Sequence, residues 1–463
     1  MMKLFHFFLF ISTFVIQPTI YGQKYYISTN GDDSYNGKTP QTAIKTLSHL
    51  NKLDLKPGDT VCFRRGDEWF GTIFLQSGNK HKKIHYTSYG KGSKPVINGS
   101  IRSTSEQDWI QVEKNLWRYN KVLTKEVGNL ISPQNIGKKK WDKKDCNQDM
   151  DFYYDKNKHL LFVCAPKNPI CLWKILDLAL NQTIIYGNSV GHIEISNLSI
   201  QNGAAHGIQL ENCFNIDINN TEISWIGGGS CPRLKNVRYG NGIELWGNNT
   251  NIFIERNYIH DIYDTGITNQ SHSAIAKQEN IIYKYNKIED CAMYSFEIWN
   301  NGHNGSSMKN ITFAENICSN SGCGWGRQRP DKVGFHINFG KTNAMVENIT
   351  IYKNVFFKGN GLILAYSSQE SAPNWFREIT LSNNKYFAAK ENIHSACFLF
   401  CDSIGPTNIF DIYQSKLCQD FSGIIFKNNI INTIILISQQ KSLNRKSRRP
   451  NNPRKPDTIY YRI

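Results

Sequence analysis

Three acidic residues in the middle of the chain have types and spacing suited to proton transfer. Glu244 and Glu297 hold the same position in two copies of a short phrase, in which a small residue is followed by apolar, variable and apolar residues. Asp264 lies two residues before another copy, which begins at Gly266. Two carboxylates at a fixed separation can act as a proton donor and as a base or nucleophile. We take Glu297 and Asp264 as the first candidate catalytic pair and Glu244 as the competing partner.

The phrase recurs along the chain, and its alternation predicts short strands whose variable position points outward. Its six copies begin at Gly207, Gly242, Gly266, Ser295, Gly334 and Gly361. Aligned on these starts, the variable position holds Gln209, Glu244, Thr268, Glu297, His336 and Ile363. Two residues further on, a second outward column holds Glu211, Trp246, Gln270, Trp299, Asn338 and Ala365.

Tryptophans beside carboxylates and amides are typical of a saccharide site. The C–H face of a sugar ring packs on an aromatic ring while its hydroxyls bond to polar groups. The candidate substrate-binding residues are His206, Trp246, Gln270, Trp299, Arg327 and His336. Arg327 lies in a basic, aromatic loop from Cys323 to Lys332, where it could hold a carboxylate with two parallel bonds. The alternative for each of these residues is a solvated position on a polar sheet or turn.

The spacing of the candidate carboxylates bears on the mechanism. Parallel strands lie about 4.8 Å apart. If the copies at Gly242, Gly266 and Ser295 are consecutive, Glu244 and Glu297 are two strands apart, about 9–10 Å between backbones, near the separation of about 6.5–9.5 Å in inverting glycosidases. Asp264 would lie one strand from Glu297, and about 5 Å would suit a retaining mechanism.

Internal repeats predict the architecture that positions these residues. A second phrase, Ile-x-apolar-x-x-Asn, places asparagines at Asn257, Asn286, Asn316, Asn354, Asn384 and Asn429. Strands this short bury a shared core only when they are stacked in parallel, and the repeated Asn can bond to its neighbours along the stack. We therefore expect an all-β, right-handed parallel β-helix solenoid.

The N-terminal part predicts a cap for this solenoid. Thr42 to Leu53 has helical spacing of apolar residues and is expected to cover the open end. The run from Lys24 to Gly99, with the turns Gly31–Gly37 and Lys56–Gly66, resembles the entry to exported bacterial parallel β-helix proteins of the pectate-lyase-like kind. The resemblance extends by repeat pattern over residues 190–435. Many such proteins are glycoside hydrolases or polysaccharide lyases, so it implies a carbohydrate-active enzyme.

Residues outside the repeats divide the rest of the chain. Residues 1–22 are predicted to be a signal peptide, 23–100 the cap and first rungs, 101–189 a β-rich insertion, 190–437 the repeats and 438–463 a basic disordered tail. Asp151–Asp155 and His159–Val163 predict a β-hairpin within the insertion. We expect an exported protein, secreted, periplasmic or at the cell surface, that is monomeric and has no transmembrane segment.

Two alternatives to a hydrolase follow from the same residues. A polysaccharide lyase would abstract a proton beside a uronate by means of a base such as His336, Lys332 or Lys341, but the dense Asp cluster of calcium-dependent lyases is absent from this sheet. A non-catalytic carbohydrate-binding or adhesion solenoid would use the same tryptophans. No cofactor is required by the sequence; Ca²⁺ could bind the Gly31–Gly37 loop, for which a simple turn is the alternative.

The net charge indicates which binding partners to expect, and the cysteine count bears on disulfides. The formal net charge is +16, of which the segment Lys441–Ile463 supplies +7 and Lys3 a further +1, so +8 remains for the body of the chain. A modest positive excess suits an acidic polysaccharide, and we expect no nucleic-acid partner. Twelve cysteines permit disulfides after export, with Cys318/Cys323 and Cys397/Cys401 as candidate pairs, while small apolar filling of the interior is the alternative.

Overall fold

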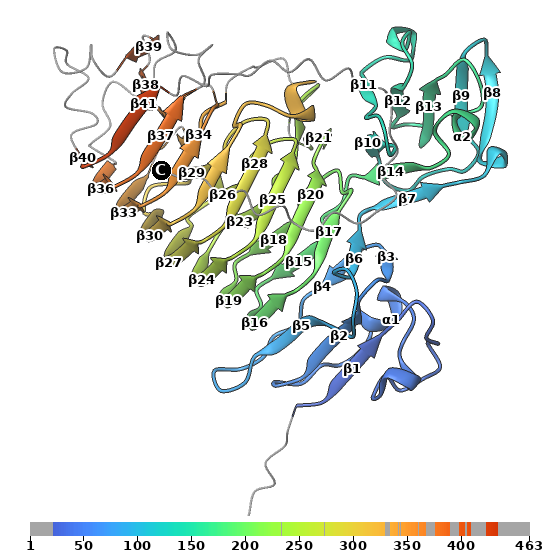
Figure 1. The fold of residues 1–463 in the computed structure, drawn as a ribbon, viewed down its shortest axis with the longest axis horizontal. Coiled ribbons are helices and arrows are strands. Elements are labelled where there is room, and N and C mark those ends of the chain that lie inside the picture. The colour runs from blue at the N-terminus through green and yellow to red at the C-terminus, as the bar shows by residue number, and fades with distance from the viewer. Residues whose placement is uncertain are drawn as a thin grey trace, which may run out of the picture.

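The computed structural model describes residues 22–232, 234–272, 274–328, 334–340, 342, 344–359, 361–366, 376–388, 398–402, 405–408 and 423–433. Within this part, three long sheets run along one stack and are almost wholly parallel (Figure 1). We call the three sheets A, B and C, in the order in which each turn of the chain contributes one strand to them. The predicted signal peptide and basic tail lie outside the described residues.

Sheet A has 11 strands, and each pairs with the next in parallel register. Its strands are β1 (Lys24–Ile27), β2 (Thr60–Arg64), β5 (Ile84–Tyr89), β16 (Gly191–Ser196), β19 (Phe214–Asn219), β24 (Asn249–Glu255), β27 (Lys277–Lys284), β30 (Ser307–Ala314), β33 (Met345–Tyr352), β36 (Phe376–Ser382) and β40 (Ile424–Lys427). Ile252, Ile281, Ile311, Ile349, Ile379 and Ile424 are consecutive partners, so the register predicted from the second phrase is confirmed.

Sheet B has 10 strands and follows sheet A around each turn. Its strands are β3 (Glu68–Phe70), β6 (Val96–Asn98), β17 (Ser199–Gln201), β20 (Glu222–Ile226), β25 (Tyr258–Ile262), β28 (Lys287–Cys291), β31 (Ile317–Ser319), β34 (Val355–Phe357), β37 (Lys385–Ala388) and β41 (Ile430–Thr433).

Sheet C has 10 strands and carries the candidate carboxylates. Its strands are β4 (Ile73–Phe74), β15 (Ile185–Asn188), β18 (Ile208–Glu211), β23 (Ile243–Trp246), β26 (Ile267–His272), β29 (Phe296–Asn301), β32 (Ile337–Phe339), β35 (Ile363–Tyr366), β38 (Phe398–Asp402) and β39 (Gly405–Asn408). Only β39 runs antiparallel to its neighbour among the described strands of this sheet.

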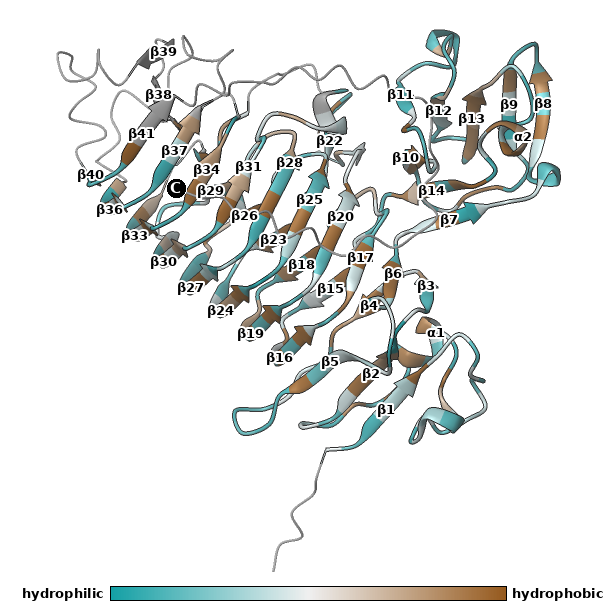
Figure 2. Ribbon diagram, in the orientation of Figure 1, coloured by the Kyte–Doolittle hydropathy of each residue, from teal (hydrophilic) through white to brown (hydrophobic). Residues whose placement is uncertain are grey.

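The core lies inside the stack and consists mainly of isoleucines. Figure 2 shows hydrophobic and hydrophilic positions alternating along the strands. Inward residues such as Ile243, Leu245 and Ile267 are fully buried. Apolar side chains from three sheets therefore share one interior, as expected of strands too short to be stable alone. The expected right-handed parallel β-helix is confirmed.

A ladder of asparagines runs along the stack at the turn from sheet A to sheet B. The backbone N–H and side-chain Nδ2 of Asn286 both donate to Oδ1 of Asn316, at 2.9 and 3.0 Å, and Asn286 Nδ2 also donates to the carbonyl of Ile254. The same contacts link Asn257, Asn286, Asn316, Asn354, Asn384 and Asn429 in turn. The predicted ladder is confirmed.

The N-terminal cap is smaller than the sequence predicts. The helix expected over Thr42–Leu53 is a 3-10 turn, η1 (Pro40–Thr42), and one helical turn, α1 (Leu47–Leu50). Between them Ile44 forms a parallel bridge with Ile27, and its N–H donates to the carbonyl of Tyr26 at 2.9 Å. The predicted length was wrong because this strand-like pairing competes with the helix for the same backbone.

The loop considered for Ca²⁺ is organised as a turn. Both oxygens of the Asp33 carboxylate are engaged, since Oδ1 accepts from the N–H groups of Lys45 and Thr46 at 2.9 Å and Oδ2 from the Thr46 hydroxyl at 2.6 Å. Asp32 accepts from the N–H of Ser34. The carboxylates thus hold the backbone that leads into α1.

The insertion is a separate β-rich body beside the solenoid (Figure 1). Its elements are β7 (Ser100–Ser103), η2 (Glu106–Asp108), β8 (Trp109–Glu113), β9 (Leu116–Tyr119), β10 (Val127–Ile131), β11 (Lys138–Lys140), η3 (Lys143–Asp145), β12 (Asp151–Asp155), β13 (Leu160–Cys164), α2 (Pro169–Trp173) and β14 (Leu176–Leu180). It has its own apolar core, which includes Trp109, Phe152 and Trp173. The predicted hairpin is confirmed as β12 paired antiparallel with β13.

Among the described cysteines, Cys318 and Cys323 are not joined by a disulfide, so this candidate pair was wrong. Cys318 is fully buried and packs in the solenoid core as a small apolar residue. Cys397 lies outside the described residues. In the part of the chain that the structure describes, no helix is long and apolar enough to cross a bilayer.

Candidate active site

The register of sheet C brings the two candidate glutamates to one face. Glu244 pairs with Thr268 and Thr268 with Glu297, so the glutamates lie two strands apart on β23 and β29, as predicted. Trp246, Gln270 and Trp299 are likewise consecutive partners in the second column. The first four positions of both predicted columns are correct.

The last two copies of the phrase were aligned wrongly. Glu297 pairs with Asn338, not with His336, and Asn338 pairs with Leu364. In the copy at Gly334 the shift is two residues, which leaves every side chain on the same face, so alternation alone does not distinguish the two registers. In the copy at Gly361 the shift is one residue, so Leu364 takes the place in this column that was predicted for Ile363, and Ile363 packs in the solenoid core instead. Asn338 therefore occupies the place beside Glu297 that was predicted for His336.

His336 is fully buried at the turn before β32. Its Nε2 lies 2.6 Å from the carbonyl oxygen of Lys358, and its Nδ1 is within hydrogen-bonding distance of the hydroxyls of Ser295 and Ser321. Burial lowers the pKa of His336 to about 4. The predicted surface position is wrong, and this histidine supports the backbone behind the site.

Glu297 is held by three donors, two from β26 on one side and one from β32 on the other. Its Oε2 accepts from Gln270 Nε2 at 2.6 Å and from the Thr268 hydroxyl at 3.1 Å, and its Oε1 accepts from Asn338 Nδ2 at 2.6 Å. Burial and the charge of Asp264 raise its pKa to about 7 in spite of these donors. Such a carboxyl exchanges its proton near neutral pH, which suits an acid–base group.

Glu244 has a drier environment. Its Oε2 accepts from Asn241 Nδ2 at 2.6 Å, whereas its Oε1 is buried and has no partner among the described residues. Burial raises the pKa of Glu244 well above its ordinary value, and the charges of Glu297 and Asp264 add to this effect. The protonated, neutral form of Glu244 is therefore favoured relative to that of an exposed glutamate.

Asp264 completes the group from the turn between β25 and β26. It is partly exposed, and its charge acts on both Glu244 and Glu297. The backbone carbonyl of Asp264 accepts a hydrogen bond from the N–H of Met293, which lies in the corresponding turn of the next rung. This bond ties the two turns together. The three predicted carboxylates thus converge on one region of sheet C.

Both glutamates are more covered than an outward column predicts, with exposures of 1 % for Glu244 and 6 % for Glu297. The cover over Glu244 comes from the turns that enter sheet C. His206 Nδ1 lies 3.8 Å from Glu244 Oε2 and accepts the N–H of Asn241. Burial lowers the pKa of His206 to about 3, so this imidazole is neutral.

Asn241 is a site residue that the sequence reasoning missed. It contacts Glu244 by its amide and His206 by its N–H, and its Oδ1 accepts the N–H of Thr265, which follows Asp264. Asn241 thus links His206, Glu244 and the turn that carries Asp264. Its place in Gly240-Asn241-Gly242, three residues before Glu244, was the available signal.

The unsatisfied polar atoms of the described residues gather at this site. Eight buried side-chain nitrogen or oxygen atoms lack a hydrogen-bond partner, and four of them belong to Glu244, Thr265, Trp299 and Asn338. Buried polar atoms without partners are rare in folded proteins, and their clustering calls for an explanation such as a bound ligand or water. They are an acid oxygen on β23, an indole N–H on β29, an amide oxygen on β32 and a hydroxyl in the turn before β26.

The remaining candidates lie at the edges of this group. The rings of Trp246 and Trp299 are partly exposed on either side of Gln270. Trp299 also packs against Gly340, where a Cβ would come within 3.2 Å of the indole. Arg327 lies in η4 (Trp325–Gln328), and its side chain is outside the described residues.

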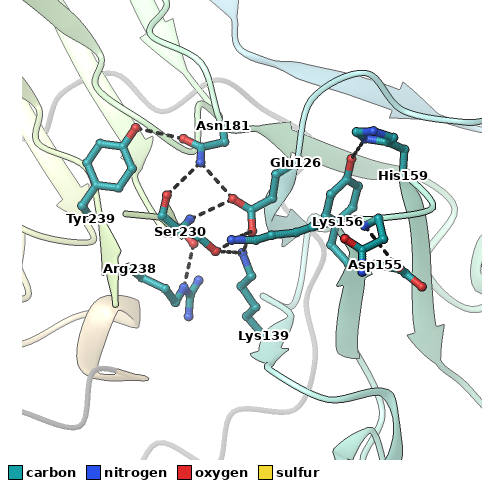
Figure 3. A network of polar contacts seen from close by, with 12 residues as sticks. Glu126, Lys139, Asp155, Lys156, His159, Asn181, Ser230, Arg238 and Tyr239 are labelled. Atoms are coloured by element: carbon teal, nitrogen blue, oxygen red, sulfur yellow. Dashed lines mark hydrogen bonds and ion pairs between the residues drawn. The ribbon is translucent and has the colours of Figure 1, made fainter. Parts of the chain in front are cut away.

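The insertion reaches the site through a polar cluster that Figure 3 shows, here called the hinge cluster: Glu126, Lys139, Asn181, Ser230 and Tyr239. Glu126 accepts from Lys139 Nζ at 2.5 Å, from Asn181 Nδ2 at 2.9 Å and from the Ser230 N–H at 3.0 Å. Ser230 and Tyr239 belong to the small hairpin β21 (Gly229–Ser230) and β22 (Arg238–Tyr239).

Tyr239 connects the hinge cluster to the carboxylates. Its hydroxyl donates to Asn181 Oδ1 at 3.0 Å, and its ring lies edge-on to His206 with 5.2 Å between centroids. His206 in turn contacts Asn241 and Glu244. The insertion therefore holds the hairpin whose Tyr239 packs against His206 beside the candidate site.

No family model matches the chain, and no curated protein matches it in sequence. Among solved structures, one described as a glycoside hydrolase has a TM-score of 0.51 at 9% identity, over 88% of this chain and 96% of that chain. The GH136 lacto-N-biosidase of Eubacterium ramulus gives 0.45 at 15% identity, over 89% and 68% of the two chains. The alginate lyase of Paenibacillus sp. str. FPU-7 gives 0.42 at 11% identity, over 84% and 97%.

These similarities concern the fold. The neighbours are parallel β-helix proteins, so the expected resemblance to pectate-lyase-like solenoids is confirmed at that level. Identities of 9–15% do not decide between hydrolysis and elimination.

Proposed function

We propose that this protein is a carbohydrate-active enzyme that hydrolyses a glycosidic bond at the carboxylates of sheet C. The observation that carries the proposal is the convergence of Glu244, Glu297 and Asp264 with four buried polar atoms that lack partners. A sugar offers hydroxyls to those atoms and C–H faces to Trp246 and Trp299.

The different environments of the glutamates suggest their roles. Glu244, whose protonated form is favoured by burial, donates a proton to the leaving oxygen. Glu297, with three donors on its oxygens, is the carboxylate whose charged form is better supported, and it acts as the base or nucleophile together with Asp264. Glu244 and Glu297 are separated by two strand spacings, which place their backbones about 9–10 Å apart; this separation leaves room for a water molecule and favours inversion.

The test is a panel of neutral and uronic-acid polysaccharides incubated with the wild-type chain and with Glu297→Gln and Glu244→Gln. Reducing ends and the absorbance of unsaturated products are measured together, with and without chelator. We expect reducing ends without the unsaturated product, and a rate about 10²–10⁴-fold lower in either variant. Glu347→Gln, on the outward face of sheet A, is the matched control and keeps full activity.

The other outcomes distinguish the alternatives. An unsaturated product would indicate a lyase, for which Lys332 and Lys341, outside the described residues, are the candidate bases. Binding of a polysaccharide without any product would indicate a carbohydrate-binding solenoid. Equal activity of Glu297→Gln and the wild type would remove the carboxylates of sheet C from the mechanism.

A further inference from the structure

A cavity lies between the insertion and sheet B. Its volume is about 510 Å³, within the range of about 300–1,000 Å³ usual for small-molecule sites. Trp225 and the amides of Gln201 and Asn202 line it from the solenoid, and Gln134 and Asn135 line it from the loop that follows β10. None of these residues belongs to the site on sheet C.

Trp225 occupies a position where a tryptophan is unfavourable. The register of sheet B places it level with Asp261, Asp290, Asn320 and Lys358 on the following rungs. All five have left-handed backbone conformations, with φ between 53° and 58°. Asparagine and aspartate tolerate this conformation, whereas a bulky residue there is strained. The indole at this corner therefore carries a cost that Asp261, Asp290 and Asn320 in the same column largely avoid.

Packing explains part of the indole's placement. Trp225 is partly buried against Ile131, Ala179 and Ala204, where the insertion meets the turn between sheets B and C. The rest of the side chain lines the cavity beside side-chain amides. An aromatic face with amide donors and acceptors around it is the chemistry that holds a sugar ring. Strained residues of this kind collect at ligand sites.

The charges around the cavity favour a neutral ligand. Arg102 is the lining residue with a positive charge, and its guanidinium is already bound by Asp177 at 2.9 Å and by Glu68 at 2.5 Å. Asp177 also accepts from Ser100 and Asn202. Among the lining residues the cavity thus offers no free cation to a uronate or a sulfate, while Gln134 and Asn135 are exposed.

We propose that this cavity is a second saccharide-binding site, which holds a neutral sugar unit on Trp225 away from the carboxylates. It would retain a polysaccharide on the protein while another part of the same polysaccharide occupies the site on sheet C. The choice of a saccharide rests on the proposed function, but binding at this cavity is measured without turnover.

The test measures binding of neutral hexasaccharides from xylan, cellulose, mannan and galactan, with hexagalacturonate as the acidic comparison, by isothermal titration calorimetry. All proteins carry Glu297→Gln so that no ligand is consumed. We expect Trp225→Asn to lower the affinity for at least one neutral ligand about tenfold or more, and Gln134→Ala to lower it by a smaller factor. Since asparagine suits the left-handed conformation, Trp225→Asn should fold normally.

Lys358→Asn is the matched control, because it makes the same kind of change in the same column on a distant, exposed corner. It should leave every affinity unchanged. Binding that is equal in Trp225→Asn, Gln134→Ala and the control, or no binding of any neutral hexasaccharide, would overturn the second site. Turnover at the site on sheet C, measured with Glu297 intact, tests the proposed function independently of this result.

Discussion

At the scale of single residues, the pKa of Glu297 makes stability depend on pH. The pKa is about 7 in the folded chain against an ordinary value of 4.5. Between these values the folded state holds a proton that the unfolded state has released, so the free energy of unfolding falls as the pH rises through this window. Buried, neutral His206 and His336 act in the opposite direction below about pH 6.5.

Glu297→Gln isolates this contribution because both histidines remain. We expect the free energy of unfolding of the variant, relative to wild type, to rise by roughly 2–3 kcal/mol between pH 5 and pH 8. Urea denaturation at the two pH values measures it. A difference that does not change with pH would mean that Glu297 keeps an ordinary pKa.

The sequence predicted part of this site and missed part of it for a physical reason. Alternation places Glu244, Thr268 and Glu297 on one face, and these strands are short enough that their order follows from the repeats. Asn338 and His336 were exchanged because registers that differ by two residues share a face. The burial of Glu244 could not be predicted, since it depends on turns such as Asn241 that have no periodicity.

At the scale of the elements, the asparagine ladder was predictable because its residue type and position both repeat. Its contribution to stability follows from its burial. Asn316 accepts two bonds from Asn286 and donates to the carbonyl of Tyr283, all away from water. By contrast, the short cap helix was overestimated, because the bridge between Ile44 and Ile27 joins residues 17 positions apart.

Asn316→Ala should lower the free energy of unfolding by about 3 kcal/mol or more, because it leaves buried donors and an acceptor without partners. The control is Asn310→Gly, in a second row of asparagines at the surface, where Asn310 Nδ2 donates to Asn280 Oδ1. Glycine keeps the left-handed conformation there, so we expect a loss below about 1 kcal/mol. Equal losses in the two variants would show that the interior ladder is not a special source of stability.

At the scale of the whole molecule, the insertion and the solenoid are joined by close backbone packing and by the hinge cluster. A Cβ on Gly128 would come within 2.5 Å of the Cα of Gly229, so β10 and the β21–β22 hairpin approach as only glycines allow. Arg238 donates to the carbonyls of Gly228 and Gly128 across the same junction. No sequence pattern predicted this contact, since it joins residues about 100 positions apart.

The buried pair of Glu126 and Lys139 should hold this junction. Burial alone would raise the pKa of Glu126, but Lys139 and the surrounding donors lower it to about 2, so the carboxylate is charged at every ordinary pH. Glu126→Gln leaves the ammonium of Lys139 buried without its counter-charge. We expect a loss of about 3–5 kcal/mol and faster hydrogen exchange in β10 and β21.

Glu113→Gln provides the comparison within the same insertion. Glu113 pairs with Lys143 at the surface, where both side chains are largely exposed. Removing such a pair costs less than about 1 kcal/mol. If Glu126→Gln exchanged hydrogen no faster than Glu113→Gln, the insertion would be held by apolar packing instead.

The direction of the asparagine ladder sets how such a protein can change in length. Each ladder residue donates its N–H and Nδ2 to the Oδ1 of the following rung, so a rung is completed by its C-terminal neighbour. A stack cut after any rung leaves the same two donors open, whatever the number of rungs before it. Duplication or deletion of whole rungs therefore leaves the same hydrogen-bonding groups at the end of the stack, so the same kind of C-terminal cap fits each length. The length of the sheet that faces a polymer can thus vary separately from the chemistry at its centre.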